Sequence, residues 1–330
     1  MFAVVLVGGF GTRLRPLTAH TPKQMLPICG VPMIEWVVSH LRDHGVREVG
    51  LALGYRPDAF LNAYPEGRIA DVPYRIAVEA EALGTAGAIR FAAQEMQLEE
   101  TFLVLNGDVL TDLDVSALVE FHGQHEAEAT IALQTVSDPS RFGVVTTTDS
   151  GQVEEFIEKP LLGKSPSNDI NAGTYVMNRS VVDRIPEGRP VSVERETFPE
   201  MAEARTLYAM QSNTYWLDTG TPEQFLEANL DVLQGRRKNK PAMPRTSIHA
   251  TAKVEDSVIG TASRVDAEAT VKHSVLFNDC HICRGATVIN SVLADEVYVG
   301  EGTRLEGCVI GSNQRIEAGA TLIGQTKPES

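Results

Sequence analysis

The chain has 330 residues, of which 43% are hydrophobic and 22% charged, and this composition predicts a folded protein with a buried core rather than a disordered chain. Its 29 Lys and Arg residues against 44 Asp and Glu residues give a net charge of −15, so we expect neither nucleic acid nor a membrane surface as a partner. No apolar run approaches the roughly 20 residues that a membrane-spanning helix needs.

The first apolar segment, residues 3–7, has no basic residue before it and runs directly into glycines. We interpret it as a first strand rather than a secretory signal peptide, and we expect a cytoplasmic protein with reduced cysteines. The four cysteines are Cys29, Cys280, Cys283 and Cys308. Cys280 and Cys283 form a C-x-x-C pair without a second pair, so we interpret them as ordinary members of a repeat rather than as zinc ligands.

The first 230 residues alternate apolar segments with amphipathic ones. In chain order, the predicted elements are strand 3–7, helix 34–45, strand 48–53, helix 85–97, and strands 101–105, 129–136, 142–146, 153–157 and 174–177. Strands that alternate with helices predict βαβ units and a mainly parallel sheet, and the shorter connections of the second half predict a mixed sheet there. A basic run bounded by proline follows at 235–241, and we interpret it as part of a linker over 235–245 rather than a phosphate-binding segment.

The last part of the chain contains a repeat of 17 residues. Similar segments start at Ser257, Ser274, Ser291 and Cys308, and aliphatic residues recur within each unit in steps of six, six and five. The aliphatic positions are Ile248, Val254, Ile259, Val265, Val271, Leu276, Ile282, Val288, Leu293, Val299, Leu305, Ile310, Ile316 and Leu322.

This period fits neither an α-helix nor an alternating strand. It predicts a triangular coil in which each face is one short strand, and one inward aliphatic side chain per face packs on the coil below. Gly285, Gly302 and Gly319 recur at the same interval, as expected at a corner that needs a positive φ angle.

The repeat resembles the left-handed parallel β-helix of hexapeptide-repeat proteins, with about five coils over residues 246–325, and the resemblance alone implies the handedness. Acyltransferases with such repeats use a histidine as a base, which makes His249, His273 and His281 candidates. We favour a role in assembly or regulation, because stacked coils present flat faces and open ends, and we expect a homo-oligomer formed through the β-helix.

Near the N-terminus, the first strand leads into Gly8, Gly9 and Gly11, where glycine lets backbone N–H groups face a phosphate. The Walker sequence G-x-x-x-x-G-K-[ST] is absent. Leu14 stands where a dinucleotide-binding loop has its third glycine, and the second strand ends without an acidic residue, which disfavours an NAD enzyme.

Three cations follow the glycines in an otherwise acidic chain. Arg13, Arg15 and Lys23 lie within 11 residues, and three prolines stiffen the same segment. A fixed loop that combines glycines, prolines and cations predicts a triphosphate-binding site rather than three scattered surface charges.

The segment Gly8-Gly9-x-Gly11-Thr12-Arg13-Leu14-x-Pro16-Leu17-Thr18, followed by Pro22-Lys23-x-x-Leu26-Pro27-Ile28, resembles the signature of the sugar-1-phosphate nucleotidyltransferases. Further matches follow in the expected order: Leu83-Gly84-Thr85-Ala86-Gly87, Asn106-Gly107-Asp108, Phe142-Gly143-Val144-Val145, Glu158-Lys159-Pro160, Asn171-Ala172-Gly173 and Trp216-Leu217-Asp218-Thr219-Gly220. Within the family, residues 191–199 and the β-helix tail are most similar to the mannose-1-phosphate guanylyltransferases.

This resemblance implies an α/β fold: a Rossmann-like mixed-sheet catalytic domain over 1–234, a linker at 235–245 and a left-handed β-helix over 246–330. It implies an enzyme that makes an NDP-sugar and pyrophosphate from an NTP and a sugar-1-phosphate, with Mg²⁺ as cofactor. The implied catalytic cations are Arg13, Lys23 and Lys159. The implied nucleotide-binding residues are Leu6, Gly8, Gly9, Gly11, Thr12, Arg13, Lys23, Glu79, Gly84 and Thr85. The implied sugar-phosphate residues are Gly143, Glu158, Lys159 and Asn171, and the implied metal ligands are Asp108 and Asp218.

Elementary chemistry agrees with these roles. A sugar phosphate has a second pKa of about 6, so its oxygen is already an anion and the attack needs no general base. Asp108 follows the strand 101–105, at the edge where α/β sheets bind ligands, although an aspartate after a strand is also a common helix N-cap. Pro160 predicts an extended Lys159, whose side chain diverges from that of Glu158 toward a phosphate; the alternative is an exposed ion pair.

The sequence also contains residues that bear on which nucleotide base and which sugar the enzyme uses. Glu79 precedes Gly84 by five residues, and a carboxylate matches the two adjacent N–H donors of guanine, which favours GTP and hence GDP-mannose. Gln24 is similar instead to the thymidylyltransferases, so a glucose-1-phosphate thymidylyl-, uridylyl- or adenylyltransferase, or an enzyme for an unusual sugar or cyclitol phosphate, stays open. A non-catalytic subunit that binds an NDP-sugar is the alternative of another class.

Overall fold

The computed structural model describes residues 1–54, 56–161, 163–237 and 246–328. The chain forms two compact units, the first made of Met1–Gly9 and Ile34–Trp216 and the second of Phe10–Met33 and Leu217–Ser330. Residues 238–245, most of the expected linker, lie outside the described residues, and the predicted domain boundaries stay a prediction. In the described part of the chain, no helix combines the length and the apolar character needed to cross a membrane.

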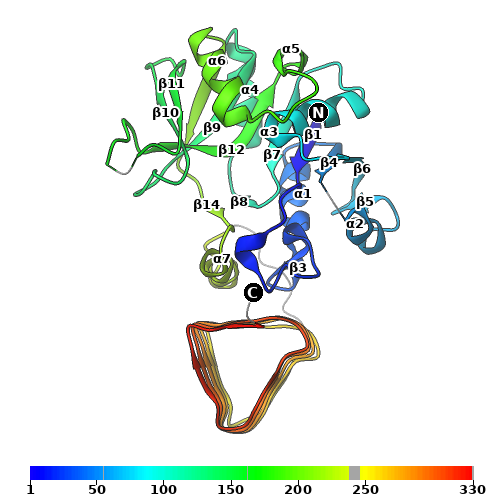
Figure 1. The fold of residues 1–330 in the computed structure, drawn as a ribbon, viewed down its shortest axis with the longest axis vertical. Helices are drawn as coiled ribbons and strands as arrows, with labels where there is room; N and C mark the ends of the chain where they lie inside the picture. The colour runs from blue at the N-terminus through cyan, green and yellow to red at the C-terminus, as the bar shows by residue number, and fades with distance from the viewer. Residues whose placement is uncertain (55, 162, 238–245, 329–330) are drawn as a thin grey trace. The chain divides into compact units, whose positions relative to one another are not determined.

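The first unit is built on a ten-stranded mixed sheet in the order β11-β10-β12-β7-β1-β4-β6-β5, with β9 paired to β12 and β13 (Figure 1). The strands of this unit are β1 (Phe2–Leu6), β4 (Glu48–Leu53), β5 (Arg68–Ile69), β6 (Val72–Val78), β7 (Phe102–Asn106), β8 (Val109–Thr111), β9 (Ala129–Thr135), β10 (Gly143–Thr147), β11 (Val153–Glu158), β12 (Asp169–Met177) and β13 (Leu207–Ser212). β1 runs parallel to β4 and β7, whereas β12 runs antiparallel to β7. The predicted change from a parallel to a mixed sheet is therefore confirmed.

The helices of this unit are α1 (Met33–Asp43), α2 (Pro57–Ala63), α3 (Gly84–Glu95), α4 (Val115–Gln124), α5 (Arg179–Arg184), the π-helix η3 (Val193–Thr197) and α6 (Phe198–Glu203). The two predicted helices, 34–45 and 85–97, correspond to α1 and α3. α4 was not predicted, although Asp114 gives it an N-cap by accepting a hydrogen bond of 2.9 Å from the Ala117 N–H.

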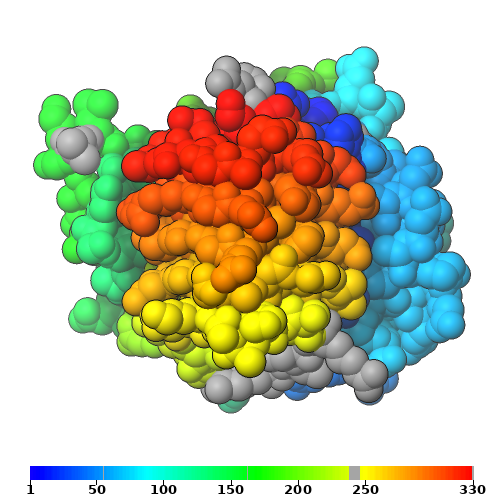
Figure 2. Space-filling model, turned by 90° about the horizontal axis from the view of Figure 1, so that it is seen from below, coloured from blue at the N-terminus to red at the C-terminus, as the bar shows by residue number. Residues whose placement is uncertain are grey.

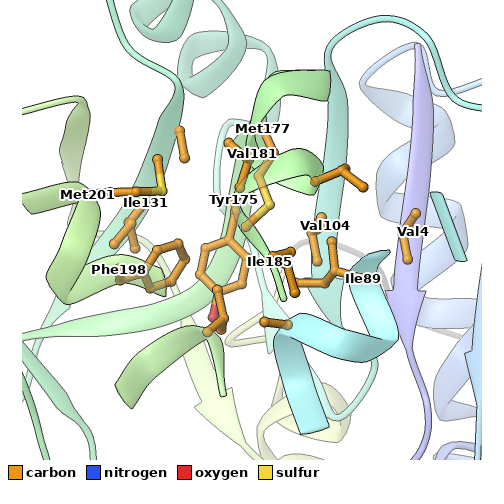
Figure 3. Packing of buried hydrophobic residues seen from close by; sticks show 14 of the residues in the cluster. Val4, Ile89, Val104, Ile131, Tyr175, Met177, Val181, Ile185, Phe198 and Met201 are labelled. Carbon is orange, nitrogen blue, oxygen red and sulfur yellow. The ribbon is translucent and has the colours of Figure 1, made fainter. Parts of the chain in front are cut away.

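An aromatic cluster lies in the core of the first unit. Tyr175 of β12 and Phe198 of α6 are fully buried, with ring centroids 5.0 Å apart in an edge-to-face arrangement (Figure 3). Phe156 of β11 packs against Phe198 with centroids 5.4 Å apart. Burying such a side chain stabilises a fold by about 1.5–3 kcal/mol, so this cluster fixes the strands β11 and β12, which carry several of the predicted site residues.

The second unit joins an N-terminal loop segment to a helix far along the chain. Its elements before the repeat are η1 (Thr12–Leu14), η2 (Lys23–Met25), β2 (Pro27–Ile28), β3 (Val31–Pro32) and α7 (Pro222–Gln234), and β14 (Trp216–Asp218) begins at the end of the first unit. The Cys29 N–H donates to the Asn229 amide oxygen of α7 at 2.7 Å. Burial raises the pKa of the Cys29 thiol to about 12, so Cys29 is an inert packing residue.

The repeat folds into three parallel sheets of five strands each, which form the sides of a triangle in Figure 1. The first sheet holds β15 (Ser247–Ile248), β18 (Arg264–Val265), β21 (His281–Ile282), β24 (Tyr298–Val299) and β27 (Arg315–Ile316). The second holds β16 (Lys253–Glu255), β19 (Thr270–Lys272), β22 (Thr287–Ile289), β25 (Arg304–Glu306) and β28 (Thr321–Ile323). The third holds β17 (Val258–Ile259), β20 (Val275–Leu276), β23 (Val292–Leu293), β26 (Val309–Ile310) and β29 (Thr326–Lys327). This arrangement is consistent with the predicted left-handed β-helix, and Figure 2 shows its coils stacked in chain order.

The predicted inward residues from Ile259 to Ile316 form one continuous apolar column, with Val254 and Leu322 partly buried at its ends. The prediction of an inward Ile248 is wrong, because this side chain in the first coil has no coil below it and is 44% exposed. Gly285, Gly302 and Gly319 have positive φ angles, as expected at a corner. The sequence did not reveal the remaining corners, because most of them use residues other than glycine. These residues of positive φ are Asp256, Ala262, Glu268, His273, Asp279, Asn290, Glu296 and Asn313.

The repeated serines have a role that the pattern alone did not reveal. The buried hydroxyl of Ser274 accepts a hydrogen bond of 3.1 Å from the Ser291 N–H of the next coil and donates one of 2.7 Å to the Lys272 carbonyl. Ser257 and Ser291 make equivalent bonds with their next coils, the latter to Cys308. The serines therefore satisfy backbone donors that the turns leave unpaired.

Candidate functional site

The glycine-rich segment of the second unit is held in one conformation by its own side chains. Gly11 has a φ angle of 60°, and a Cβ there would lie 2.9 Å from Cγ2 of Thr18. The Thr18 hydroxyl donates a hydrogen bond of 2.7 Å to the Gly11 carbonyl. Leu14, which replaces a third glycine, is fully buried and anchors η1, while Thr12 and Arg13 are exposed.

Lys23, Arg13 and Asp218 come together in the second unit, although Asp218 is nearly 200 residues away in sequence. The Lys23 ammonium lies 3.8 Å from Oδ1 of Asp218. A Cβ at Gly220 would lie 3.0 Å from a guanidinium nitrogen of Arg13 and 3.1 Å from Oδ2 of Asp218. Lys23 is only 5% exposed, so it is not a scattered surface charge. A buried cation, an exposed guanidinium and a carboxylate thus form one cluster.

In the first unit, Asp108 lies beside the end of the first strand. The Gly107 N–H donates a hydrogen bond of 2.9 Å to the Leu6 carbonyl, and a Cβ at Gly107 would lie 2.9 Å from that same oxygen. This close approach requires glycine and places Asp108 next to the strand end that leads into Gly8 and Gly9. β8 begins directly after Asp108, so the helix N-cap alternative is wrong.

Glu79 lies near Gly8 in the same unit. A Cβ at Gly8 would lie 4.0 Å from Oε1 of Glu79. The other oxygen, Oε2, accepts a hydrogen bond of 2.9 Å from the Leu83 N–H and so closes the turn before α3. The side chain is 7% exposed, and burial raises its pKa, an effect that the Leu83 hydrogen bond opposes. Glu79 therefore has a structural role whether or not it contacts a base.

Gly84 and Thr85 attach the start of α3 to a distant segment. Gly84 has a φ angle of 75°, and a Cβ there would lie 2.5 Å from the Val191 carbonyl oxygen. The Thr85 hydroxyl donates to Glu194 at 2.7 Å and accepts from the Val193 N–H at 2.9 Å. The hydroxyl of Thr85 is thus engaged with η3, a link that sequence spacing did not reveal.

Gly143, Glu158 and Lys159 lie together at the ends of β10 and β11. Gly143 pairs with Glu158, and a Cβ at Gly143 would lie 3.1 Å from Oε2 of Glu158. The prediction of an extended Lys159 is wrong, because its φ angle is 50° and its N–H donates to the Phe142 carbonyl at 3.0 Å. The predicted divergence of the two side chains is also wrong: the Lys159 ammonium lies 3.1 Å from Oε1 of Glu158.

That conformation has a physical consequence. A non-glycine residue in the left-handed region costs on the order of 1–3 kcal/mol, and such strain is found most often at functional sites. The hydrogen bond to Phe142 offsets part of the cost and overrides the extended preference that Pro160 imposes. Lys159 is 57% exposed, so its ammonium can leave the ion pair for an incoming anion.

Asn171 is oriented by Tyr175, a residue that the sequence analysis missed. The Asn171 side chain donates a hydrogen bond of 2.9 Å to the Tyr175 hydroxyl and accepts one of 2.9 Å from the Gly173 N–H. Burial and then the charge of Glu194 raise the pKa of Tyr175, which keeps the hydroxyl protonated. In the sequence, Tyr175 is only a tyrosine in an apolar strand, four residues after Asn171. Such a residue cannot be told from an ordinary core residue.

The predicted site residues thus fall into two groups. The first unit contains Leu6, Gly8, Gly9, Glu79, Gly84, Thr85, Asp108, Gly143, Glu158, Lys159 and Asn171, and the second contains Gly11, Thr12, Arg13, Lys23 and Asp218. Asp108 and Asp218 each supply hard carboxylate oxygens, the ligands that a divalent cation such as Mg²⁺ prefers.

Comparison with known proteins gives two family matches. Residues 2–235 match the family described as "Nucleotidyl transferase", and residues 241–329 match "GlmU-like, C-terminal hexapeptide". Mannose-1-phosphate guanylyltransferase 1 of Arabidopsis thaliana is 40% identical over 267 residues, which cover 79% of this chain and 73% of the relative. Mannose-1-phosphate guanylyltransferase of Mycobacterium tuberculosis (strain ATCC 25618 / H37Rv) is 41% identical over 235 residues, 71% of this chain and 65% of the relative.

Among solved structures, a putative glucose-1-phosphate thymidylyltransferase from Bacillus anthracis, in complex with a sucrose, is similar with a TM-score of 0.65 and 24% identity. The match covers 74% of this chain and 98% of that chain. HddC from Yersinia pseudotuberculosis matches with a TM-score of 0.60 and 28% identity over 69% of this chain and 97% of that chain. The Bacillus likeness shows a shared fold.

Proposed function

The chain belongs to the nucleotidyl transferase family, and from this premise we propose that it makes GDP-mannose and pyrophosphate from GTP and mannose-1-phosphate. The substrates are inferred from relatives named mannose-1-phosphate guanylyltransferase that are about 40% identical. The broader reaction is transfer of a nucleotidyl group from an NTP to the phosphate of a sugar-1-phosphate.

One observation carries this proposal: the cluster of Arg13, Lys23 and Asp218. A chain of net charge −15 buries Lys23 to 5% exposure beside the Asp218 carboxylate, and the Arg13 guanidinium lies close to Gly220, two residues after Asp218. Burying a charge is costly unless it is paired, and Asp218 supplies that pairing for Lys23, which places the ammonium where it can also meet a phosphate. We assign Arg13 and Lys23 to the triphosphate and to the leaving pyrophosphate.

The reaction is an in-line displacement at the α-phosphorus. A sugar phosphate oxygen forms a bond to that phosphorus, the bond to the bridging oxygen of the β-phosphate breaks, and pyrophosphate leaves with the electron pair. Two anions must approach each other, so the protein contributes positioning and positive charge rather than a general base.

The residues of β10, β11 and β12 supply the other substrate site in this proposal. Lys159 exchanges its ion pair with Glu158 for the sugar phosphate, and the freed Glu158 carboxylate accepts from sugar hydroxyls. The Gly143 N–H and the Asn171 amide, which Tyr175 orients, add neutral hydrogen bonds.

Asp108 and Asp218 would hold Mg²⁺, which would neutralise phosphate charge and orient the triphosphate for the attack. In our proposal, the backbone close to Gly8, Gly9 and Gly11 contacts the phosphates, and Leu6, Thr12, Gly84 and Thr85 shape the nucleotide site. Glu79 accepts from the two adjacent donors of guanine, which is the physical reason to prefer GTP.

Steady-state rates test this proposal directly. Pyrophosphate release is measured with GTP, dTTP, UTP and ATP, each combined with mannose-1-phosphate and glucose-1-phosphate. We expect the highest kcat/KM for GTP with mannose-1-phosphate, and a dominant rate with another pair would replace the substrate assignment. Asp108→Ala should lose most Mg²⁺-dependent turnover, whereas Asp149→Ala, an exposed aspartate of the same unit, should not.

Three further expectations belong to this proposal. The catalytic domain covers residues 1–234, the β-helix covers 246–330 and mediates homo-oligomer formation, and the protein acts in the cytoplasm. Sedimentation of the full chain checks the assembly, and a monomer at working concentration would contradict it.

A further inference from the structure

A side-chain cluster on the β-helix lies outside the catalytic residues. Among the residues that the structure describes, Asp266, His281 and Cys283 bring three potential metal-ligand atoms within 4.8 Å of one another. Asp266 directly follows β18; in the next coil, His281 begins β21 and Cys283 directly follows it, on either side of the inward Ile282. Two adjacent coils thus contribute to one cluster, in which Asp266 and His281 are partly exposed and Cys283 is buried.

The distances are close to those of a metal site. Nε2 of His281 lies 2.8 Å from Oδ2 of Asp266 and 3.9 Å from Sγ of Cys283. Zinc bonds of about 2.0–2.3 Å to nitrogen, oxygen and sulfur hold tetrahedral ligand atoms about 3.3–3.6 Å apart. The two separations from His281 bracket that range, and all three ligand atoms lie within 4.8 Å of one another, so side-chain rotations that draw Cys283 inward would complete the set of ligands.

The same geometry excludes a catalytic triad. In a Cys-His-Asp triad, one ring nitrogen contacts the carboxylate and the other contacts the thiol. Here Nε2 faces both Asp266 and Cys283. One nitrogen cannot donate a proton to a carboxylate and accept a proton from a thiol at the same time. A single metal ion, in contrast, can bind the imidazole, the carboxylate and the thiolate together.

The chemistry of the donors selects the ion. Thiolate, imidazole and carboxylate together suit Zn²⁺, which is borderline soft, and not Mg²⁺ or Ca²⁺, which prefer oxygen. The side chains of His281 and Asp266 are 33% and 21% exposed, so water can reach the fourth position. Arg264 binds the other oxygen of Asp266 at 2.6 Å and thereby orients the carboxylate.

We propose that Asp266, His281 and Cys283 bind one Zn²⁺ ion that links two adjacent coils of the β-helix. The C-x-x-C pair does not act as a pair in this site. Cys280 belongs to the buried core, and its thiol donates to the Ala294 carbonyl at 3.1 Å. The ion is a cross-link that the folded β-helix binds and the unfolded chain does not, so it stabilises the fold by mass action.

The test measures zinc binding by the full chain after removal of metals with a chelator. Zinc is titrated in competition with a chromophoric chelator, and cobalt is bound separately to detect a thiolate-to-metal charge-transfer band. We expect one zinc per chain and a higher melting temperature with zinc. Cys283→Ser and His281→Ala should weaken binding by about 100-fold or more, since even outer-shell changes cost 10–100-fold. The cobalt band should disappear in Cys283→Ser.

Cys280→Ser is the matched control, because Ser263 occupies the equivalent position in the preceding coil and already donates and accepts there. It should bind zinc like the parent chain. Asp108→Ala should also bind zinc normally, which separates this site from the proposed magnesium site. The proposal is overturned if zinc does not bind, if Cys283→Ser keeps the cobalt band, or if Cys280→Ser loses it. Circular dichroism verifies that each variant is folded.

Discussion

Glu79 is the residue through which we expect base selection to be altered most specifically. Its carboxylate is 7% exposed, and one oxygen accepts from the Leu83 N–H at 2.9 Å. Glu79→Gln keeps an acceptor for Leu83 but replaces a carboxylate oxygen by an NH₂ group, which would face the donors of guanine. The loss of a hydrogen bond to a charged group costs about 1.5–3 kcal/mol, so kcat/KM for GTP should fall about 10- to 150-fold.

The assay compares kcat/KM for GTP and dTTP in the parent chain, Glu79→Gln and Glu79→Ala, with a saturating sugar phosphate. Glu79→Ala also removes the acceptor for Leu83, so it should lower both activities and the melting temperature. Glu79→Gln should shift the ratio toward dTTP without lowering the melting temperature. An unchanged ratio would show that Glu79 serves only the turn before α3, and the guanine assignment would lose its physical basis.

The pH dependence gives a second readout of the same residue. Burial raises the pKa of Glu79 above its ordinary value of 4.5, so the carboxyl becomes protonated at a higher pH than an exposed glutamate does. Guanine binding needs the ionised form, so kcat/KM for GTP should fall as the pH decreases through this raised pKa. This decrease in kcat/KM at low pH should be absent in Glu79→Gln.

Three other substitutions test single contacts. Ser274→Ala leaves the buried N–H of Ser291 without its 3.1 Å acceptor and should lower the free energy of unfolding by about 1–3 kcal/mol in chemical denaturation. Gly84→Ala places a Cβ 2.5 Å from the Val191 carbonyl oxygen and should raise KM for the nucleotide in a folded protein. Lys23→Met removes the buried cation and should lower kcat about 100-fold or more in a rate assay.

Each of these substitutions has a control in the chain. Ser274→Cys should cost less than Ser274→Ala, because Cys308 fills the equivalent position of a later coil. Gly123→Ala lies in α4 with nothing within 4 Å of the new Cβ and should leave KM unchanged. Lys164→Met changes an exposed lysine and should leave kcat unchanged. Equal effects in a variant and its control would contradict the assigned contact.

The sequence predicted most of the β-helix, because the 17-residue period is visible directly in the spacing of the aliphatic residues. The aliphatic positions of the six, six and five steps from Ile259 to Ile316 lie in one buried column, whereas Ile248 at the open end is exposed. The non-glycine corners, such as Ala262 and Glu268, were missed because stacking between coils, rather than local preference, sets their positive φ angles.

The arrangement of the site residues depended on contacts that the preferences of neighbouring residues do not predict. The pairing of Lys23 with Asp218 joins residues far apart in the chain, and only the motif resemblance suggested a shared function. At Lys159 the local rule failed, since a hydrogen bond to Phe142 overrides the effect of the following proline. The orientation of Asn171 by Tyr175 needed the packed core. Local sequence patterns therefore predicted most strands of the sheet and two helices but missed others, such as α4 and α7, and the side-chain arrangement came from tertiary contacts.

The proposed reaction is tested most directly by phosphorus NMR of one sample containing the enzyme, GTP, mannose-1-phosphate and Mg²⁺. We expect GDP-mannose and pyrophosphate to accumulate in equal amounts, and neither to form when one substrate is omitted. Release of orthophosphate instead of pyrophosphate, or the absence of an NDP-sugar with every nucleotide tried, would contradict the proposed reaction.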